Sequence, residues 1–296
     1  MATLGIDLGG TKIALGVLEA DRLVYEARVA TPTEGAEAVL QVMIAAATEA
    51  IAESPAPVRA VGVGSPGPID FERGVVLFAP NIAGFREVEL AGRLREALEL
   101  PVRIENDANA AALAEHRLGA ARGARSSLFV TVSTGIGGGL VADGRVWRGA
   151  FGQAGEFGHL TVLPGGPVCG CGQQGCLEAV ASGRAMARDA SYAYAEPMGA
   201  PELFDRWRAG EAKAARIVEA AAVYLGQALA DAQKLWDPEV IVLGGGVAVG
   251  GGKAWLERVE LAFAAHTEGW RRAPLRPAEL GERAGVIGAA LAAQEA

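Results

Sequence analysis

The sequence predicts a mixed α/β fold built from two similar halves. Two clusters of apolar strands carry this prediction, one over residues 3–30 and one over residues 126–149, and each contains a glycine-rich turn. Helical patterns follow each cluster, and strands that alternate with helices are typical of α/β proteins. The length of 296 residues fits about two domains. We therefore expect a duplicated α/β unit, although no residue-by-residue repeat is visible.

The first half opens with three strands and continues with alternating helices and strands. The segments "TLGIDL", "IALGVL" and "RLVYEARVA" predict strands over residues 3–8, 13–18 and 22–30. Apolar residues at helical spacing predict a helix over 35–54, which Pro55 and Pro57 end. The elements expected next are a strand over 58–64, a helix over 88–100, a strand over 101–106 and a helix over 107–121.

The second half repeats this opening. Residues 126–149, "SSLFVTVSTGIGGGLVADGRVWRG", predict strands interrupted by a glycine run. An apolar stripe from Val218 to Trp236 predicts one long helix. The segment "PEVIVL" then predicts a buried strand that enters another glycine turn.

Composition and charge exclude several classes of protein. The net charge of −8 argues against a nucleic-acid partner, which would require a basic face. No apolar run reaches the roughly 18 residues of a membrane span, and "MATLGIDLGGTK" lacks the features of a signal peptide. We therefore expect a cytoplasmic protein with no membrane partner, and disulfides are rare in that compartment.

Three glycine-rich turns at strand ends are candidate ligand sites. The first, "DLGGTK" from Asp7 to Lys12, joins two strands, whereas Walker and dinucleotide-binding loops need a helix after the turn. A plain hairpin is the alternative, since Gly-Gly is a favoured two-residue turn. The opposite charges of Asp7 and Lys12 and the hydroxyl of Thr11 suit a magnesium-bound polyphosphate, and backbone N–H groups around such a turn bind anions.

The second turn is "STGIGGG" (Ser133 to Gly139) and the third is "LGGGV" (Leu243 to Val247). One glycine turn is weak evidence for a ligand. Three of them, each at the end of an apolar strand, predict a nucleotide held between two α/β domains.

All three cysteines of the chain fall within "VCGCGQQGCLE", residues 168–178. Their odd number and the expected reducing compartment argue against disulfides. Thiols clustered in this way are more often metal ligands.

Six segments resemble the ROK family (repressors, open reading frames, kinases) in their order and spacing: "GIDLGGTK", "VGVGSPGPID", "IENDANAAALAE", "VSTGIGGG", "GEFGHLTVLPGGPVCGCGQQGCLE" and "VIVLGGG". The resemblance extends from Gly5 to about Ala290. It implies a two-domain actin-like ATPase (duplicated ribonuclease H-like) fold, with nucleotide and sugar in the interdomain cleft. We expect a small domain over 1–117, joined by a C-terminal helix at about 285–296, and a large domain over 118–284 that carries the cysteine loop.

The cysteine loop also has a histidine at a suitable place. His159 lies ten residues before Cys169 and, with Cys171 and Cys176, completes a Cys3His set. Structural zinc favours four such tetrahedral ligands and leaves no open position for water, which disfavours a catalytic ion. Incidental thiols are the alternative, and the resemblance implies zinc.

The resemblance also implies a hexose site. Carboxylates, amides and imidazole recognise hydroxyl groups by hydrogen bonding. Phe85 stands where many family members carry Trp, and we expect it to keep an aromatic wall beside the sugar. The expected sugar-binding residues are Ser65, Gly67, Asn81, Asn106, Asp107, Glu156, His159 and Glu178.

The implied reaction is transfer of the ATP γ-phosphoryl group to the 6-hydroxyl of a hexose. Taken alone, Asp107 is most simply explained as a helix N-cap, but it matches the family's catalytic base. Mg²⁺ would bridge the phosphates, with Asp7 as a partner through water, and domain closure would exclude solvent. The expected nucleotide-binding residues are Asp7, Gly9, Gly10, Thr11, Lys12, Ser133, Thr134, Gly135, Gly137, Gly138, Gly244, Gly245 and Gly246.

Several alternatives stay open. The favoured sugar is glucose, but kinases of N-acetylglucosamine, mannose, fructose and N-acetylmannosamine share these residues. A sugar-sensing repressor of the family would carry an N-terminal helix-turn-helix, for which the strand expected at Thr3 leaves no room. The second alternative is therefore a sugar-sensing regulator that lacks its DNA-binding domain. A sugar-binding protein without turnover is a third class, which an ADP-release assay would separate. We also expect a homo-oligomer, either a dimer or a tetramer.

Overall fold

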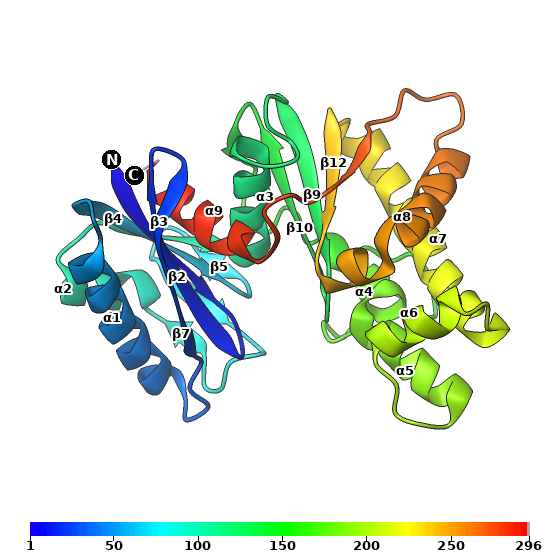
Figure 1. The fold of residues 1–296 in the computed structure, drawn as a ribbon, viewed down its shortest axis with the longest axis horizontal. Helices are drawn as coiled ribbons and strands as arrows, with labels where there is room; N and C mark the ends of the chain where they lie inside the picture. The colour runs from blue at the N-terminus through cyan, green and yellow to red at the C-terminus, as the bar shows by residue number, and fades with distance from the viewer. Residues whose placement is uncertain (295–296) are drawn as a thin grey trace. The chain divides into compact units, whose positions relative to one another are not determined.

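The computed structural model describes residues 1–294, which fall into two compact units. The first unit comprises Met1–Gly123, Gly139–Ala154 and Glu279–Ala296, and the second comprises Ala124–Gly138 and Gly155–Ala278 (Figure 1). The predicted domain division at residues 117 and 284 stays a prediction. The last two residues of the predicted C-terminal helix lie outside the described residues.

Two five-stranded sheets have the same strand order. The first is ordered β3-β2-β1-β4-β8 and the second β11-β10-β9-β12-β13, so along the chain both are 3-2-1-4-5. This shared order is the duplicated unit that the sequence predicts. The first sheet consists of β1 (Ala2–Leu8), β2 (Lys12–Glu19), β3 (Arg22–Ala30), β4 (Val58–Ser65) and β8 (Val102–Asn106). The second consists of β9 (Ser126–Val132), β10 (Ile136–Ala142), β11 (Arg145–Val146), β12 (Val240–Gly244) and β13 (Leu275–Pro277).

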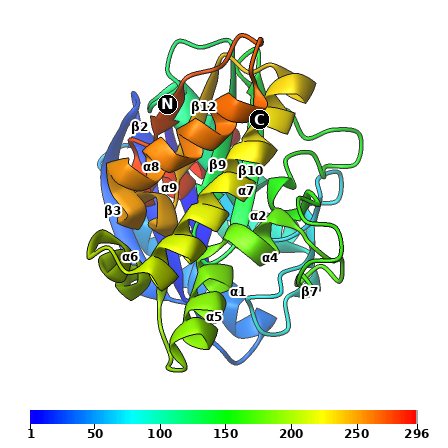
Figure 2. The ribbon, with the colours of Figure 1, turned by 90° about the vertical axis from the view of Figure 1, so that its right-hand side faces the viewer.

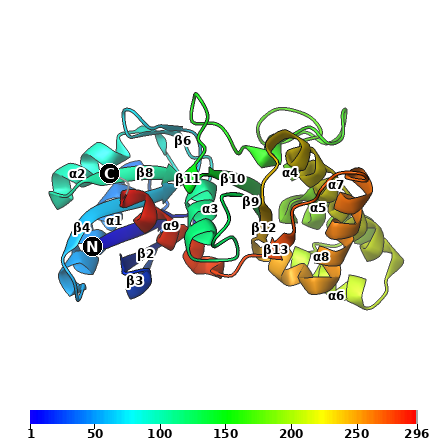
Figure 3. The same cartoon turned by 90° about the horizontal axis from the view of Figure 1, so that it is seen from above.

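Helices cover both faces of the first sheet. Because side chains alternate along β1, Leu4 and Ile6 enter a core that also contains residues of α1 and α2. Gly5 faces the other way, and a Cβ on it would overlap the carbonyl oxygen of Val286 in α9. Helices α3 and α9 lie side by side in this unit (Figure 3). The helices of this unit are α1 (Ala36–Glu53), α2 (Leu90–Leu98), α3 (Asp107–Arg117) and α9 (Ala284–Ala293).

The second unit contains five α-helices among its described residues, and the two longest, α7 and α8, pack side by side (Figure 2). The long helix predicted up to Trp236 is confirmed as α7. The other four, including α8 directly after the third glycine turn, are additional to the prediction. The helices are α4 (Leu177–Ala181), α5 (Gly183–Tyr194), α6 (Ala200–Arg208), α7 (Ala212–Trp236) and α8 (Gly246–His266).

A three-stranded sheet of very short strands completes the first unit, in the order β5-β6-β7. The sequence predicts a helix over 88–100, but Val88 belongs to the last strand of this sheet, and the helix begins at Leu90. Within residues 1–294, no helix is long and apolar enough to cross a membrane. The short strands are β5 (Ile69–Asp70), β6 (Val75–Phe78) and β7 (Arg86–Val88).

Candidate active site and metal centre

Two predicted carboxylates converge at one edge of the first sheet. Strands β1, β4 and β8 are parallel neighbours, and their register places Asp7 opposite Gly64. A Cβ on Gly64 would lie 3.7 Å from Asp7 Oδ1 and 3.8 Å from the Cα of Asp107. The carboxyl ends of parallel strands commonly form ligand sites in α/β proteins. Glycine at position 64 therefore leaves Asp7 and Asp107 close to each other at such an edge.

Burial and mutual repulsion disfavour the ionised forms of these carboxylates. Burial, and then the charge of Asp107, raise the pKa of Asp7 to about 6, and Lys12 acts in the opposite direction. Burial also raises the pKa of Asp107, against the effect of the backbone N–H groups of Ala108 and of Asp107 itself. A nearby divalent cation would relieve both effects, since it favours the charged form of each group.

Helix α3 begins with a cap that differs from the predicted one. Asn106 is the N-cap, and its Oδ1 accepts hydrogen bonds from the N–H groups of Ala108 at 3.0 Å and Asn109 at 3.2 Å. Asp107 is the first helical residue, and its Oδ1 accepts from the same Ala108 N–H at 2.8 Å. The N-cap explanation of Asp107 is therefore wrong, because the neighbouring amide performs that role.

The first glycine turn joins β1 and β2 as a hairpin, so the predicted strand–turn–strand connection is confirmed. The Gly9 N–H donates to the Lys12 carbonyl at 3.0 Å, and the Thr31 hydroxyl donates to the Gly9 carbonyl at 2.7 Å. A Cβ on Gly10 would lie 2.7 Å from the carbonyl oxygen of Asn81. The turn expected to bind nucleotide therefore packs directly against the loop that carries an expected sugar ligand.

Lys12 is engaged in an ion pair on the surface of the same unit. Its Nζ lies 3.0 Å from Glu282 Oε2, and Arg28 Nη1 lies 3.0 Å from the same oxygen. Glu282 belongs to the short segment before α9, which the sequence did not single out. The structure therefore places Lys12 beside the turn, with its ammonium group paired to Glu282.

The loop between β6 and β7 presents Asn81 to solvent and hides Phe85. Phe85 is only 1% exposed and belongs to the core with α1 and α2. The expected aromatic wall at Phe85 is therefore wrong, since the ring supports the loop from beneath. Gly67 has φ +86°, and the carbonyl oxygen of Phe78 occupies the place of a Cβ. Ser65 is buried, and its hydroxyl donates to the Pro66 carbonyl at 3.2 Å.

The second unit brings its two glycine turns together. Strands β9 and β12 are parallel neighbours, and a Cβ on Gly245 would lie 2.7 Å from Thr131 Oγ1. A Cβ on Gly246 would lie 3.7 Å from Ser133 Oγ. Gly246 is also the first residue of α8, and helix N-termini favour phosphate groups. Hydroxyl groups and the N-terminus of α8, which is interrupted by a kink at Gly252, therefore meet at this edge.

The turn from Ser133 to Gly139 is also joined to the cysteine segment. Glu178 Oε2 accepts a hydrogen bond from the Ile136 N–H at 2.9 Å, and a Cβ on Gly135 would overlap this carboxylate oxygen. A Cβ on Gly138 would lie 2.8 Å from the Cβ of Phe157. Gly135 and Gly138 are thus required by packing, and Glu178 contacts the turn expected to bind nucleotide.

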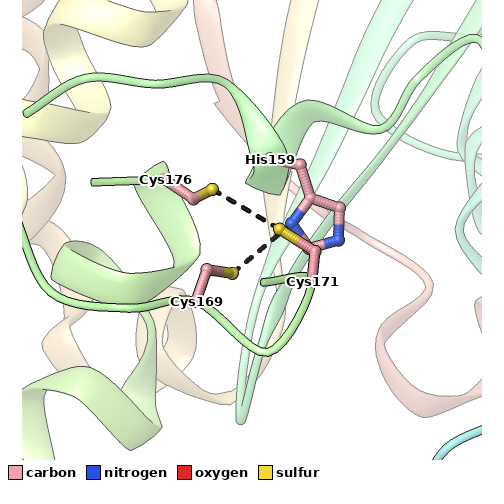
Figure 4. Close-up of side chains that lie close together, drawn as sticks. All are labelled: His159, Cys169, Cys171 and Cys176. Carbon is pink, nitrogen blue, oxygen red and sulfur yellow. Dashed lines mark hydrogen bonds between the residues drawn. The ribbon is translucent and has the colours of Figure 1, made fainter. Parts of the chain in front are cut away.

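The four predicted metal ligands point toward one another (Figure 4). Cys171 Sγ and Cys176 Sγ lie 3.7 Å apart, Cys169 Sγ and His159 Nδ1 lie 3.6 Å apart, and all four ligand atoms lie within 4.8 Å of one another. Ligands at about 2.0–2.3 Å from a tetrahedral zinc ion are separated by about 3.3–3.8 Å. The two measured pairs have this separation, so the donor set suits one tetrahedral zinc ion.

The charge state of the thiols favours a cation in the same place. Burial, together with the other two thiols, raises the pKa of Cys176 to about 12, and burial also raises the pKa of Cys169. Burial acts on Cys171 as well, but the Gln173 N–H and the neighbouring thiols lower its pKa overall. A bound metal would allow all three thiols to ionise together, since metal coordination deprotonates a thiol.

His159 offers its two ring nitrogens to different neighbours. Nδ1 faces the thiols, and Nε2 lies 3.9 Å from Glu156 Oε2. The Glu156 side chain is 54% exposed, so a ligand can reach it. One ring nitrogen can thus bind metal while the other side of the ring adjoins a carboxylate that can accept hydroxyl hydrogens.

The sequence did not point to two buried carboxylates of the first unit. Glu105 pairs with Arg148, and Glu115 accepts backbone N–H groups from Ala120 at 2.9 Å and Leu280 at 2.8 Å. Both lie within the quoted segment "IENDANAAALAE". Their partners are distant in sequence or belong to the backbone, so no local sequence pattern predicts that these two carboxylates are buried.

Comparison with known proteins identifies relatives along the whole chain. The sequence profile of the ROK family matches residues 3–296. The crystal structure of a ROK hexokinase from Thermus thermophilus is 52% identical with a TM-score of 0.94, and the alignment covers 100% of this chain and 98% of that one. A ROK family glucokinase from Streptomyces griseus, crystallised with glucose and AMPPNP, is 36% identical with a TM-score of 0.87 over 100% of both chains. A glucokinase of Streptomyces coelicolor is 38% identical over 99% of this chain and 98% of its own length.

These similarities bear on the predicted fold as well as on the family. The structural neighbours have the two-domain actin-like ATPase fold, and the two 3-2-1-4-5 sheets of this chain agree with it. The predicted fold class is confirmed. With a profile match that leaves out only the first two residues, the chain belongs to the ROK family.

Proposed function

We propose that the protein transfers the γ-phosphoryl group of ATP to the 6-hydroxyl of a hexose, with glucose as the preferred acceptor. The observation that carries this proposal is the pair of carboxylates, Asp7 and Asp107, at one edge of the first sheet. One carboxylate can serve a magnesium-bound phosphate and the other an acceptor hydroxyl. The glucokinases and the hexokinase among its relatives support the same reaction.

Asp107 is the proposed general base. Its raised pKa brings the carboxylate closer to the range in which a base can accept a proton at neutral pH. Asn106 keeps α3 capped, so the Asp107 carboxylate can turn to a substrate without loss of the helix start. Phosphoryl transfer depends mainly on such positioning and on charge stabilisation.

The remaining site residues have proposed roles in binding. Asp7 would hold Mg²⁺ through water, and the backbone of the hairpin around Gly10 would bind phosphate oxygens. In the second unit, Ser133 and the α8 N-terminus at Gly246 would contact the nucleotide. The sugar hydroxyls would be bound by Ser65, Gly67, Asn81, Asn106, Glu156, His159 and Glu178.

The Cys3His set is proposed to hold one structural zinc ion. The support is the separation of the ligand atoms, which suits tetrahedral coordination without a position for substrate. The ion would fix the loop that begins at His159 and ends at Cys176, and thereby Glu156 and Glu178 on either side. A cytoplasmic location and a homo-oligomeric state remain predictions.

An ADP-release assay with a panel of hexoses tests the reaction. We expect turnover with glucose, with mannose, fructose, N-acetylglucosamine and N-acetylmannosamine as the comparison. Asp107→Asn should reduce kcat by about 10²–10⁴-fold and leave glucose binding nearly intact, since Asn keeps the shape but cannot accept the proton. A folded variant with near-normal kcat would remove Asp107 from the chemistry, and the absence of turnover with every sugar would refute the proposal.

Metal analysis tests the zinc proposal separately. One zinc ion per chain should copurify, and Cys171→Ser should lose both the ion and thermal stability. Gln174→Ala, which truncates an exposed side chain in the same loop and removes no ligand, is the control. Active protein that contains no zinc would contradict the proposal.

A further inference from the structure

A buried carboxylate next to the proposed base has no role in the function described so far. Glu105 is the last residue but one of β8, two residues before Asp107, and its side chain is 0% exposed. One oxygen, Oε1, accepts the Asn106 N–H at 3.0 Å and the Asn109 Nδ2 at 3.1 Å. The other, Oε2, accepts Arg148 Nε at 2.8 Å and is also in contact with Nη2 of the same guanidinium.

These contacts enclose Asp107 from both sides. Asn106 precedes Asp107 and Asn109 follows it by two residues, and both are held by the same Glu105 oxygen. Asn106 Oδ1 also accepts the N–H groups of Ala108 and Asn109, so these cap bonds lie within the same residues, 106–109. The backbone that carries the Asp107 carboxylate is therefore fixed by a network centred on Glu105.

Arg148 anchors this network to a second segment of the first unit. It follows β11, lies 43 residues from Glu105 in sequence and is 31% exposed. Its guanidinium carbon lies 5.2 Å from the centre of the Phe71 ring, and a Cβ on Gly152 would lie 2.7 Å from the same ring. A planar guanidinium can bind a carboxylate through two N–H groups and stack on an aromatic face together, which an ammonium group cannot reproduce.

The charge of Glu105 explains why it is paired with a cation. A carboxylate removed from water is costly unless a cation and further hydrogen bonds compensate it. Neutral residues could fill the same space, so stability alone does not require a buried ion pair here. A second role, fixing the geometry of the adjacent Asp107, would explain why an ion pair and not a pair of neutral side chains occupies this place.

We propose that Glu105 and Arg148 are positioning residues for Asp107. The pair holds residues 106–109 so that the Asp107 carboxylate keeps the orientation needed to accept the proton of the sugar hydroxyl. This inference rests on the proposed function. Misplacement of a reacting group by about 1 Å can cost about 10²-fold in rate, so the pair can influence turnover without contact to substrate.

The test compares three variants with the wild type. Arg148→Lys keeps the positive charge but loses the planar fork. The double variant Glu105→Gln with Arg148→Met removes both charges together, so it leaves no unpaired buried ion. The Gln amide oxygen can still accept hydrogen bonds from Asn106 and Asn109, but the side chain loses the guanidinium that fixes it. The control is Glu37→Gln with Arg93→Met, which removes an exposed ion pair between α1 and α2 in the same unit.

The neutral double variant should melt close to the wild type and lose about 10–100-fold in kcat, with the KM for MgATP within about twofold. Arg148→Lys should lose less than the double variant, and the Glu37/Arg93 control should keep full turnover. A folded double variant with kcat within twofold of the wild type would overturn the proposal, because the pair would then serve stability alone.

Hydrogen exchange gives a readout that does not depend on turnover. The amides of Asn106, Ala108 and Asn109 should exchange at least about tenfold faster in the double variant, and not in the control. Unchanged protection at these amides would also overturn the proposal. If the wild type phosphorylates no hexose, the proposed function fails, and the exchange data still decide whether the pair holds the Asp107 segment.

Discussion

Replacement of Asp7 by asparagine should make the ligand-free protein more stable at neutral pH. Burial, and then the charge of Asp107, raises the pKa of this carboxyl from 3.8 to about 6. At about 1.4 kcal/mol per pKa unit, ionisation of Asp7 costs the folded state about 3 kcal/mol. Asparagine has a similar shape and no charge, so Asp7→Asn should recover most of this free energy of unfolding.

The sign of the pH dependence follows from the raised pKa. Below about pH 4 the carboxyl is protonated in the folded and unfolded chain, and both proteins should be about equally stable. As the pH rises through about 6, the wild type loses stability that the variant retains. Three charged or titratable groups are relevant to this titration: Asp107 and Lys12, which act on Asp7 directly, and Glu282, which pairs with Lys12.

Urea unfolding without nucleotide or Mg²⁺, at pH 4.5, 5.5, 6.5 and 7.5, measures the effect. The gain should be near its full value of about 3 kcal/mol at pH 7.5, or about 6 °C in Tm, and should shrink at pH 4.5. Asp21→Asn, in the exposed β2–β3 turn, controls for the change in net charge. An equal gain at pH 4.5 and 7.5, or none beyond the Asp21 control, would refute the reasoning. The same variant should use MgATP poorly, so that stability and function change in opposite directions.

Three further outcomes follow from the same geometry. Gly10→Val should weaken both nucleotide and hexose binding by at least about tenfold in calorimetry, because the new side chain would displace the Asn81 loop; an effect on nucleotide alone would contradict the packing. Gly67→Ala should lower the free energy of unfolding by about 2 kcal/mol or more in urea, since φ is +86° and Phe78 blocks the Cβ; unchanged stability would contradict this. The kcat/KM for MgATP should fall about tenfold per pH unit below about pH 6, as Asp7 becomes protonated; a flat profile from pH 5 to 7 would argue against a role of the Asp7 charge.

The elements that the sequence predicts well are those with a long regular pattern. The strands from Ala2 to Ala30 alternate, and α7 has a continuous apolar stripe, so local periodicity suffices for both. The sequence also predicts that the four proposed metal ligands lie together, because they fall within 18 consecutive residues and zinc ligands have characteristic spacing.

The features that escaped prediction depend on contacts between distant segments. Strands of two to four residues, such as β5 and β6, are too short to show a period. The burial of Phe85 follows from packing against α1 and α2, and the ion pair of Glu105 depends on Arg148, 43 residues away. In "VRIEN", Glu105 has the pattern of an ordinary strand end, and its burial becomes evident only with its partner in place.

The position of α9 has a consequence for how the chain acquires its structure during synthesis. This helix covers the face of β1 around Gly5, so two segments more than 280 residues apart must meet before the first sheet is shielded from water. Contacts so distant in sequence slow folding, because a long loop has to close first. The stretch from Gly155 to Ala278 is continuous and is made earlier than α9. We expect most of the second unit to become ordered on the ribosome while the face of β1 that contains Gly5 is still exposed to water. That face is therefore the surface that a chaperone would protect.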